Sequence, residues 1–406
     1  MTRILHTADW HLGARLVDND RLPEQALFLD WLLERIAVLK PTLLLVAGDI
    51  FDTANPPQQA LALYYRFLAR LACSATPCRV LILGGNHDSP ATLNAPREVL
   101  SALSVTVVGE ALQDPAEALL EFPDLLVCAV PYLRERDVRS AVAGQSFDEV
   151  AAGIRVGVRA YYRRLYEVAA TKAQGRPILA SGHLTVAGSL GSDSERLIHV
   201  GNLGAVGADC FQGFAYVALG HIHKPQAADT AGLVRYPGSP VPLSFSEVGI
   251  PKELRIIDAD TKGLRHSYEE IPVFRKLVRV RTPTEGIQSL LRSLQSSFDK
   301  SLEPWLELTV EDGVEFPDLD RLVREASKGL ALRVLKVLVP QPKTAADGSN
   351  LQVGEAPSLD TLSPREVFQE RLRHAGIEAQ SEAWTRLEGT FLELLSSMQD
   401  AEGKSS

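Results

Sequence analysis

A series of short apolar runs, separated by helix-length segments, constrains the fold of this chain more than any other feature. The runs occupy residues 3–8, 42–48, 79–85, 105–109, 124–130, 177–182 and 215–220. Segments with a helical pattern, such as residues 23–40 and 57–72, lie between them. Uniformly apolar strands that alternate with helices are typical of a layered α/β domain whose sheet is buried on both faces. We therefore expect residues 1–272 to form such a domain.

The pattern changes after residue 272. The next segment predicts strand, helix, strand, helix and strand, in the stretches "FRKLVRVRTP", "TEGIQSLLRSLQSSFDKS", "PWLELTVE", "PDLDRLVREASKG" and "LRVLKVLVP". We expect residues 273–340 to form a compact α+β unit of roughly 70 residues, a size that is feasible when the unit docks on a larger domain.

The end of the chain is predicted to be a linker followed by a helical tail. Residues 341–362 are rich in Pro, Gly, Ser and Asp, as linkers are. Residues 363–406 begin with a capping box of Ser363, Pro364 and Glu366. An apolar stripe follows on one helical face, formed by Trp384, Leu387, Phe391, Leu394 and Leu395. So small a unit cannot bury this stripe alone, so the tail packs either on its own protein or in a partner's groove.

Asp, Asn and His residues directly follow several of the apolar runs. They occur in "ADWH" (8–11), "GDIFD" (48–52), "GGNHD" (84–88), "GH" (182–183) and "GHIH" (220–223). Binding sites of open α/β sheets form beyond the carboxyl ends of the strands, where these clusters would converge. The glycine before most clusters lets the chain leave its strand sharply and lets backbone approach a bound group.

Each cluster alone has a simpler explanation. Residues two apart on a strand share a face, so His221 and His223 could reach one common point, but a lone His-x-His is also typical of a solvated turn. Asp49 could cap a helix, and "GNHD" could be a turn. The combination favours a site, because the chain has nine histidines and these clusters contain many of them. These are His11, His87, His183, His221 and His223.

The side chains in these clusters predict a metal centre. The candidate ligands are Asp9, His11, Asp49, Asn86, His183, His221 and His223. A mixture of carboxylate, amide and imidazole without cysteine is unlike a structural zinc site. It suits octahedral divalent ions, and the number of imidazoles favours manganese or iron over magnesium. The candidates are too many for one ion with open positions, so two ions that share a carboxylate fit better.

In this order, D-x-H, G-D-x-x-D, G-N-H-D, G-H and G-H-x-H resemble the calcineurin-like metallophosphoesterases. The longer strings "TADWHLG", "VAGDIFD", "GGNHDSP", "ALGHIHKPQ" and "YPGSPVPLSFSE" (236–247) resemble the SbcD family of nuclease subunits within that superfamily. This family is the bacterial relative of the eukaryotic double-strand-break repair nuclease. The resemblance implies a two-sheet α/β sandwich as the phosphoesterase domain, residues 273–340 as a DNA-capping domain and a C-terminal helical tail that binds a partner. It is weakest after residue 340.

The resemblance also implies roles for the clustered residues. One ion takes Asp9, His11, Asp49 and His223, and the other takes Asp49, Asn86, His183 and His221, with Asp49 bridging. The two histidines of "GHIH" therefore serve different ions. His87 assists the departing oxygen as a general acid or hydrogen-bond donor, and Asp88 orients its imidazole. Asp52 either supports a ligand from behind or faces the substrate.

The function implied by the resemblance is hydrolysis of DNA by two divalent ions, with manganese expected. The activity is that of an exonuclease and endonuclease on double-strand ends and hairpins, in DNA repair, recombination and replication. The chain contains no P-loop, since the terminal "GKSS" lacks the upstream glycine. In the family, ATP is handled by an SbcC-type coiled-coil ATPase, and we expect a homodimer of this chain within a heterotetramer.

The net charge of the chain does not decide between nucleic acid and a small molecule as the substrate. The net charge is −9, which argues mildly against a broad nucleic-acid surface, but two dications and local basic strips at 158–167 and 274–281 could attract a phosphate backbone. The alternative is a metallophosphodiesterase for small molecules, which has no evident need of the α+β unit or the tail. A non-catalytic scaffold is disfavoured because the ligand set is complete.

The expected location is the cytoplasm, without a membrane association. The beginning of the chain has no apolar segment of signal-peptide length, and no stretch approaches a membrane span. Cys73, Cys78, Cys128 and Cys210 have neither C-x-x-C spacing nor the density of a disulfide scaffold, as expected for reduced thiols.

Overall fold

The computed structural model describes residues 1–140, 145–195, 205–295, 302–316 and 318–340. It also describes single positions in the tail, at 368, 372, 381, 384, 386, 387 and 391. The chain divides into two compact units. The first comprises Met1–Leu197 and Asn202–Pro342, and the second comprises Ile198–Gly201 and Lys343–Ser406.

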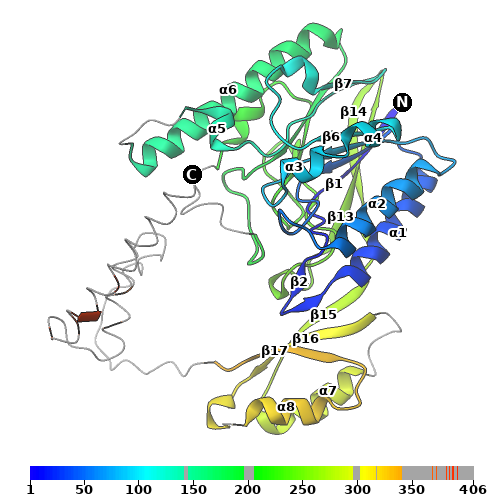
Figure 1. Cartoon of the computed structure of the whole chain (residues 1–406). Coiled ribbons are helices and arrows are strands. Elements are labelled where there is room, and N and C mark those ends of the chain that lie inside the picture. Colours follow the sequence, from blue (N-terminus) through cyan, green and yellow to red (C-terminus); the bar gives the residue numbers. More distant parts are fainter. Residues whose placement is uncertain are drawn as a thin grey trace. The chain divides into compact units, whose positions relative to one another are not determined.

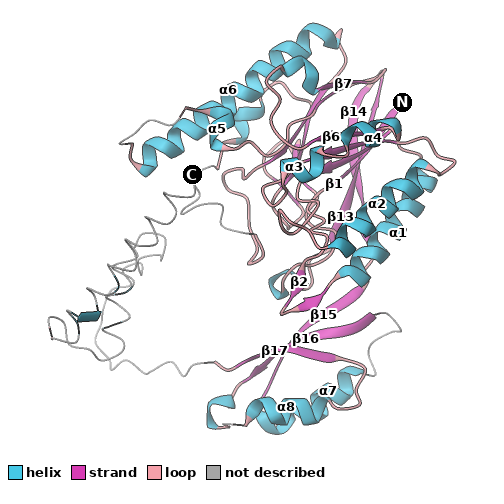
Figure 2. Cartoon of the chain, viewed as in Figure 1, coloured by secondary structure: helices cyan, strands magenta, loops and turns pink. Residues whose placement is uncertain are grey.

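Two six-stranded sheets form the larger part of the first unit (Figures 1 and 2). The first sheet has the order β14 (Gly263–Ile271), β13 (Lys252–Asp260), β1 (Thr2–Thr7), β4 (Leu43–Ala47), β5 (Arg79–Leu83), β6 (Val105–Val108). The second has the order β11 (Gln226–Ala227), β12 (Val234–Tyr236), β10 (Tyr216–Gly220), β9 (Ile178–His183), β8 (Leu126–Cys128), β7 (Leu119–Glu121). The expected two-sheet α/β sandwich is confirmed.

The strands from β1 to β6 in the first sheet are parallel, as are β8, β9, β10 and β12 in the second. Every apolar run in the sequence overlaps one of these strands. The antiparallel hairpin of β13 and β14 was not among the predicted runs. Its second strand is only partly buried and carries Arg265, Glu269 and Glu270, so it lacks the apolar pattern that marks the other strands.

Alternate residues of the buried strands face two different cores, which explains why the runs are apolar without alternation. Leu43 and Leu45 of β4 belong to the core between the two sheets. Leu44 and Val46 of the same strand face the core under helices α1 (Leu22–Leu39) and α2 (Gln58–Ala72). A third core lies between the second sheet and α6 (Phe147–Ala173).

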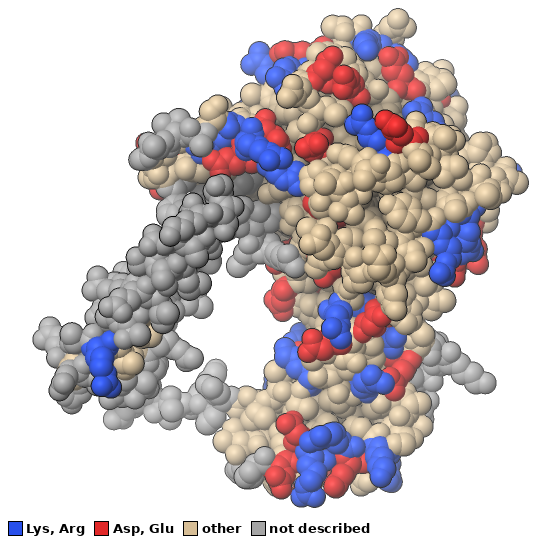
Figure 3. All heavy atoms as spheres, viewed as in Figure 1, with Lys and Arg blue, Asp and Glu red and all other residues tan. Residues whose placement is uncertain are grey.

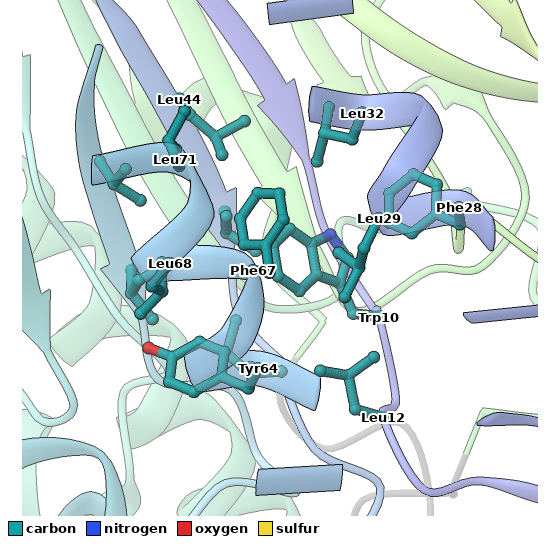
Figure 4. Packing of buried hydrophobic residues seen from close by; sticks show 14 of the residues in the cluster. Trp10, Leu12, Phe28, Leu29, Leu32, Leu44, Tyr64, Phe67, Leu68 and Leu71 are labelled. Carbon is teal, nitrogen blue, oxygen red and sulfur yellow. The ribbon is translucent and has the colours of Figure 1, made fainter. Parts of the chain in front are cut away.

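Trp10 anchors the turn that follows β1. Its indole is fully buried and lies edge-to-face against Phe28 and Phe67, with ring centroids 5.9 and 5.5 Å away (Figure 4). The indole Nε1–H donates to Thr7 Oγ1 over 3.1 Å. Because Trp10 stands between Asp9 and His11 in the chain, its packing fixes the position of both neighbours.

Short elements complete the sandwich. The helices are α3 (Pro90–Asn94), α4 (Arg97–Ala102) and α5 (Glu135–Val138), and the 3-10 turns are η1 (Pro115–Ala118), η2 (Ala208–Phe211) and η3 (Phe245–Glu247). A small hairpin of β2 (Arg15–Leu16) and β3 (Asn19–Asp20) precedes α1.

The segment after residue 272 forms a three-stranded parallel sheet with two helices, in the predicted order. The strands are β15 (Arg275–Thr282), β16 (Leu302–Val310) and β17 (Arg333–Leu338), and the helices are α7 (Ile287–Gln295) and α8 (Leu319–Ser327), with turns η4 (Thr284–Gly286) and η5 (Gly313–Glu315). Its own core includes Leu291 of α7, Leu308 of β16 and Val323 of α8. A second, smaller cluster joins Leu277 and Trp305 to the sandwich residues Leu16 and Phe245.

The tail is described at few positions. The capping box, the predicted linker 341–362 and the stripe residues Leu394 and Leu395 lie outside the described residues. Trp384, Leu387 and Phe391 are helical, and Trp384 is buried. The rings of Phe368 and Phe391 stack with centroids 4.1 Å apart. In the described parts of the chain, no helix combines the length and the apolar character that crossing a bilayer requires.

Candidate metal centre

The predicted ligands converge beyond the carboxyl ends of strands from both sheets. Asp9 and His11 follow β1, Asp49 follows β4, and Asn86 follows β5 of the first sheet. His183 ends β9, and His221 and His223 follow β10 of the second sheet. The sandwich therefore brings together residues that are more than 200 positions apart, as the ring contact between His11 and His223 shows.

Three groups of potential ligand atoms form within this cluster, with the ligand atoms of each group within 4.8 Å of one another. Asp9, His11 and His223 make the first group, Asp49, His183 and His221 make the second, and His11, Asp52 and His87 make the third. Asp49 links the first two groups, because its Oδ2 is 3.6 Å from His11 Nε2 and 3.2 Å from His183 Nε2. Asn86 Oδ1 lies 2.9 Å from His183 Nε2 and 3.1 Å from His221 Nδ1. The arrangement suits two cations that share the Asp49 carboxylate.

The hydrogen bonds around Asp9, His11 and His223 show whether these residues can hold a cation. His11 Nδ1 lies 3.2 Å from the Asp52 carboxylate, and His223 Nδ1 lies 2.7 Å from Ser194 Oγ. If both Nδ1 atoms carry the proton, both Nε2 atoms present lone pairs, and these face each other at 3.2 Å. Asp9 Oδ2 is buried and has no hydrogen-bond partner among the described residues. Opposed lone pairs beside an unpaired carboxylate oxygen are the surroundings a divalent ion requires.

Burial and mutual charge shift the pKa values of the cluster strongly. Burial raises the pKa of the Asp9 carboxyl to about 7, and the nearby Asp49 carboxylate adds to this while the charge of His183 opposes it. The same His183 charge, with those of His11 and His87, outweighs burial at Asp49 and holds its pKa well below the usual range. Burial and the charge of His183 lower the pKa of His221 to about 3. The Asp49 and Asp9 carboxylates outweigh burial at His183 and raise the pKa of its imidazole to about 9. Metals bind neutral imidazoles and ionised carboxylates, so a cation that binds here would release protons from His183 and Asp9.

The backbone at several predicted ligands is strained. Asp9, His11, Asp49 and His221 have φ values of 53, 43, 48 and 99°, in the left-handed region that non-glycine residues rarely occupy. Such strain persists only where surrounding structure enforces it, and it concentrates at functional sites. The burial of these four residues supplies that enforcement.

The glycines before the clusters make room for ligands from neighbouring strands. A Cβ on Gly220 would lie 1.9 Å from the Ala47 carbonyl oxygen and 2.8 Å from His183 Nδ1. A Cβ on Gly85 would lie 2.1 Å from Asp49 Oδ1. The sequence predicted that these glycines let backbone approach a bound group. In the structure they let the ligand-bearing segments approach one another.

His87 lies at the edge of the cluster, and its surroundings differ from the expectation. The imidazole Nδ1 is 2.7 Å from the Asp52 carbonyl oxygen, and Nε2 is 4.0 Å from Asp49 Oδ2. Asp88 was expected to orient this ring, but its carboxylate accepts the backbone N–H groups of Ile50, Phe51 and Gly85. The Asp52 carbonyl provides the orienting contact, while Asp88 ties the loops after β4 and β5 together.

Residues that sequence reasoning did not assign surround His223. Its backbone N–H donates to Glu195 Oε1 over 2.8 Å, and its Nδ1 contacts Ser194. Glu247 is the last residue of the string "YPGSPVPLSFSE", which resembles the SbcD family, and it is fully buried. That string is the signal in the sequence that could have pointed to this region.

The two basic strips are largely paired with carboxylates. On α6, Arg159 contacts Asp209 at 2.6 Å, and Arg163 contacts Glu167 at 2.9 Å. On β15, Arg279 contacts Glu307 at 2.7 Å, and the neighbouring arginines have acidic partners as well. Blue and red side chains are accordingly interspersed on the described part of the face shown in Figure 3. Neither strip is a bare positive surface.

Comparisons with known proteins identify the family of the chain. A model of the calcineurin-like phosphoesterases matches residues 2–225, and a model described as the type 5 capsule protein repressor C-terminal domain matches residues 273–375. The SbcD subunit of the nuclease SbcCD from Escherichia coli strain K12 is 35% identical over 409 residues, which cover 98% of this chain and 100% of that protein. The protein of the same name from Bacillus subtilis strain 168 is 32% identical, covering 99% and 100%.

A solved dimetal phosphatase from Danio rerio is 12% identical, covering 66% of this chain and 98% of that one, with a TM-score of 0.40. The phosphoesterase match spans over half of this chain, and the SbcD relatives align along nearly its whole length. The chain belongs to the SbcD family of nuclease subunits and carries a calcineurin-like phosphoesterase domain, a hydrolase that uses divalent metal ions.

Proposed function

We propose that the chain is the catalytic subunit of a manganese-dependent DNA nuclease that cuts at double-strand ends and hairpins during DNA repair, recombination and replication. The observation that carries this proposal is the pair of buried ligand groups on either side of Asp49. The four imidazoles among the ligands favour manganese over magnesium. The relatives are named as subunits of a nuclease, SbcCD, which favours DNA over a small phosphodiester.

The proposed ligands divide between two ions. One ion would be held by Asp9, His11, Asp49 and His223, and the other by Asp49, Asn86, His183 and His221. When bound, the ions neutralise charge on the phosphate and make water at the site more acidic. Asp52 supports His11 through its carboxylate.

His87 is the proposed proton or hydrogen-bond donor. Its Nδ1–H donates to the Asp52 carbonyl, which leaves Nε2 on the side of the ring that faces Asp49. A proton on Nε2 then assists the oxygen that leaves the phosphorus. Asp88 keeps the loop that carries His87 fixed against the loop after β4, through hydrogen bonds from the N–H groups of Ile50 and Phe51.

The division of labour proposed along the chain is a nuclease domain at 1–272, a DNA-capping domain at 273–340, a linker at 341–362 and a partner-binding tail at 363–406. The partner is an SbcC-type coiled-coil ATPase, bound by a homodimer of this chain within a heterotetramer. The family of the relatives and the lack of a P-loop support this partner. Four free cysteines support a reducing compartment, the cytoplasm.

Removing residues 363–406 tests the role of the tail. We expect the shortened protein to hydrolyse a simple phosphodiester with manganese at the wild-type rate, because no proposed ligand lies in the tail. It should no longer co-purify with the ATPase. Continued co-purification would place the docking surface elsewhere on the chain.

The test of the whole proposal is a nuclease assay on linear and hairpin-ended duplexes with manganese, with and without the ATPase and ATP. We expect cleavage of both duplexes and its loss on chelation of the metal. A small-molecule phosphodiesterase would hydrolyse an aryl phosphodiester while leaving both duplexes intact, and that outcome would overturn the assignment of DNA as substrate.

A further inference from the structure

Glu247 is buried behind the metal centre, at the end of the string "YPGSPVPLSFSE". Its side chain is 0% exposed, and it lies in η3, outside the clusters that supply the proposed ligands. Ser194 Oγ lies 2.7 Å from Glu247 Oε1 and 2.7 Å from His223 Nδ1. One hydroxyl therefore connects a buried carboxylate to a proposed metal ligand.

Glu247 accepts hydrogen bonds from several neighbouring groups. The Lys252 ammonium, which is also buried, donates to Oε2. The Leu243 N–H donates to Oε1 over 3.2 Å. Lys252 also donates to Ser239 Oγ and to the carbonyl oxygen of His223, over 3.0 and 3.1 Å. The ion pair is thus attached to both the backbone and the side chain of His223.

The direction of the hydrogen bonds follows from the charge of Glu247. Because the carboxylate only accepts, the Ser194 hydroxyl donates its proton to Glu247 and presents a lone pair to His223. His223 Nδ1 must then carry the ring proton, and its Nε2 faces His11 Nε2 as a lone pair. The carboxylate selects the tautomer of His223 that can bind a metal.

We propose that Glu247 and Ser194 are positioning residues for metal binding, which hold His223 in the tautomer and orientation that the ion shared with Asp9 and His11 requires. The inference rests on the proposed function only in taking His223 as a metal ligand. Neither residue belongs to the proposed ligand sets.

The burial of the pair supports a role beyond stability. Removing Glu247 and Lys252 from water is costly, and a buried ion pair often contributes no more to stability than apolar side chains of equal size. The same groups fix a ligand, and loss of a partner that orients a metal-binding imidazole costs roughly 10- to 100-fold in metal affinity. The contacts from Glu247 through Ser194 to His223 therefore contribute more to metal affinity than to folding stability.

The test compares Ser194→Ala with Ser194→Thr, which keeps the hydroxyl, and with Ser267→Ala, at an exposed serine on β14. Manganese binding to the full chain is titrated by calorimetry, and DNA cleavage is measured over a range of manganese concentrations. For Ser194→Ala we expect one site weakened by about 10- to 100-fold and the other unchanged. The manganese concentration for half-maximal cleavage should rise in proportion, while KM for DNA at saturating metal stays the same. Ser194→Thr and Ser267→Ala should resemble the wild type.

Glu247→Gln provides a second variant of nearly the same size, which should weaken the same site. Unchanged affinity at both sites in Ser194→Ala, equal weakening of both, or an equal loss in Ser194→Thr would overturn the inference. Failure of the proposed function is distinguishable: a wild-type protein that binds two manganese ions but cuts no duplex contradicts the nuclease and leaves the affinity comparison valid.

Discussion

Replacing His87 with alanine should slow DNA cleavage by about 10²- to 10⁴-fold, the usual contribution of a positioned proton donor. That range corresponds to about 2.7–5.4 kcal/mol in the barrier. The ring also contacts His11 edge-on, with centroids 4.8 Å apart, a contact worth roughly 0.5–1.5 kcal/mol to stability. A packing loss of this size is small beside the usual folding stability of about 5–15 kcal/mol, so the variant should remain folded. It should also bind two metal ions, because His87 is not a proposed ligand.

The assay uses two substrates that differ in whether the leaving oxygen must be protonated. An alkoxide leaves DNA and requires protonation, whereas bis(p-nitrophenyl) phosphate releases a nitrophenolate that does not. His87→Ala should therefore lose much more activity on duplex DNA than on the aryl diester. Asn55→Ala, at an exposed position in the loop after Asp52, is the control. Equal losses on both substrates, or loss of manganese binding by calorimetry, would refute the role of His87 as a donor.

Three further predictions concern the frame around the site. Trp10→Phe should lower the free energy of unfolding by about 2 kcal/mol, from the lost Nε1 hydrogen bond and a partly empty indole cavity; an unchanged urea midpoint would contradict this. Gly220→Ala should lower it by about 1–3 kcal/mol, because its Cβ meets the carbonyl oxygen of Ala47, and should weaken manganese binding; a calorimetric titration and a melting curve like those of the wild type would disprove it. Burial and the Arg255 charge lower the pKa of His6 to about 3, so the unfolded chain alone gains this proton below the ordinary pKa of about 6.5. Stability should then fall by about 2 kcal/mol between pH 7 and 5, and His6→Gln should remove that share in urea titrations at the two pH values.

The strands and the ends that carry Asp9, Asp49 and His183 could be predicted from the sequence. Apolar runs that end in glycine and polar residues mark both the strand and the place where it stops. The resemblance then ordered the clusters into one site. The division of the strands between two sheets could not be derived from the runs, because a strand buried on both faces has the same composition in either sheet.

Contacts that depend on side-chain direction were not predictable either. Adjacency in "GGNHD" suggested that Asp88 orients His87, but neighbouring residues need not face each other, and the structure gives that contact to a carbonyl from another loop. The link from His223 through Ser194 to Glu247 spans more than 50 positions and carries no spacing rule. The sequence did not predict the charged strand β14, because its pairing with β13, and not its own composition, makes it a strand.

Each proposed ligand set contains residues from both sheets, so metal binding affects the stability of the folded state. Asp9, His11, Asp49 and Asn86 come from the first sheet, and His183, His221 and His223 from the second. Each ion would thus be a cross-link between the two halves of the sandwich. A cross-link of this kind adds RT ln(1 + [L]/Kd) to stability, about 2.7 kcal/mol at a hundredfold excess over Kd. Chelators should therefore lower the stability of the contact between the two sheets as well as stop catalysis. The metal concentration in the cell would then influence the lifetime of the folded protein.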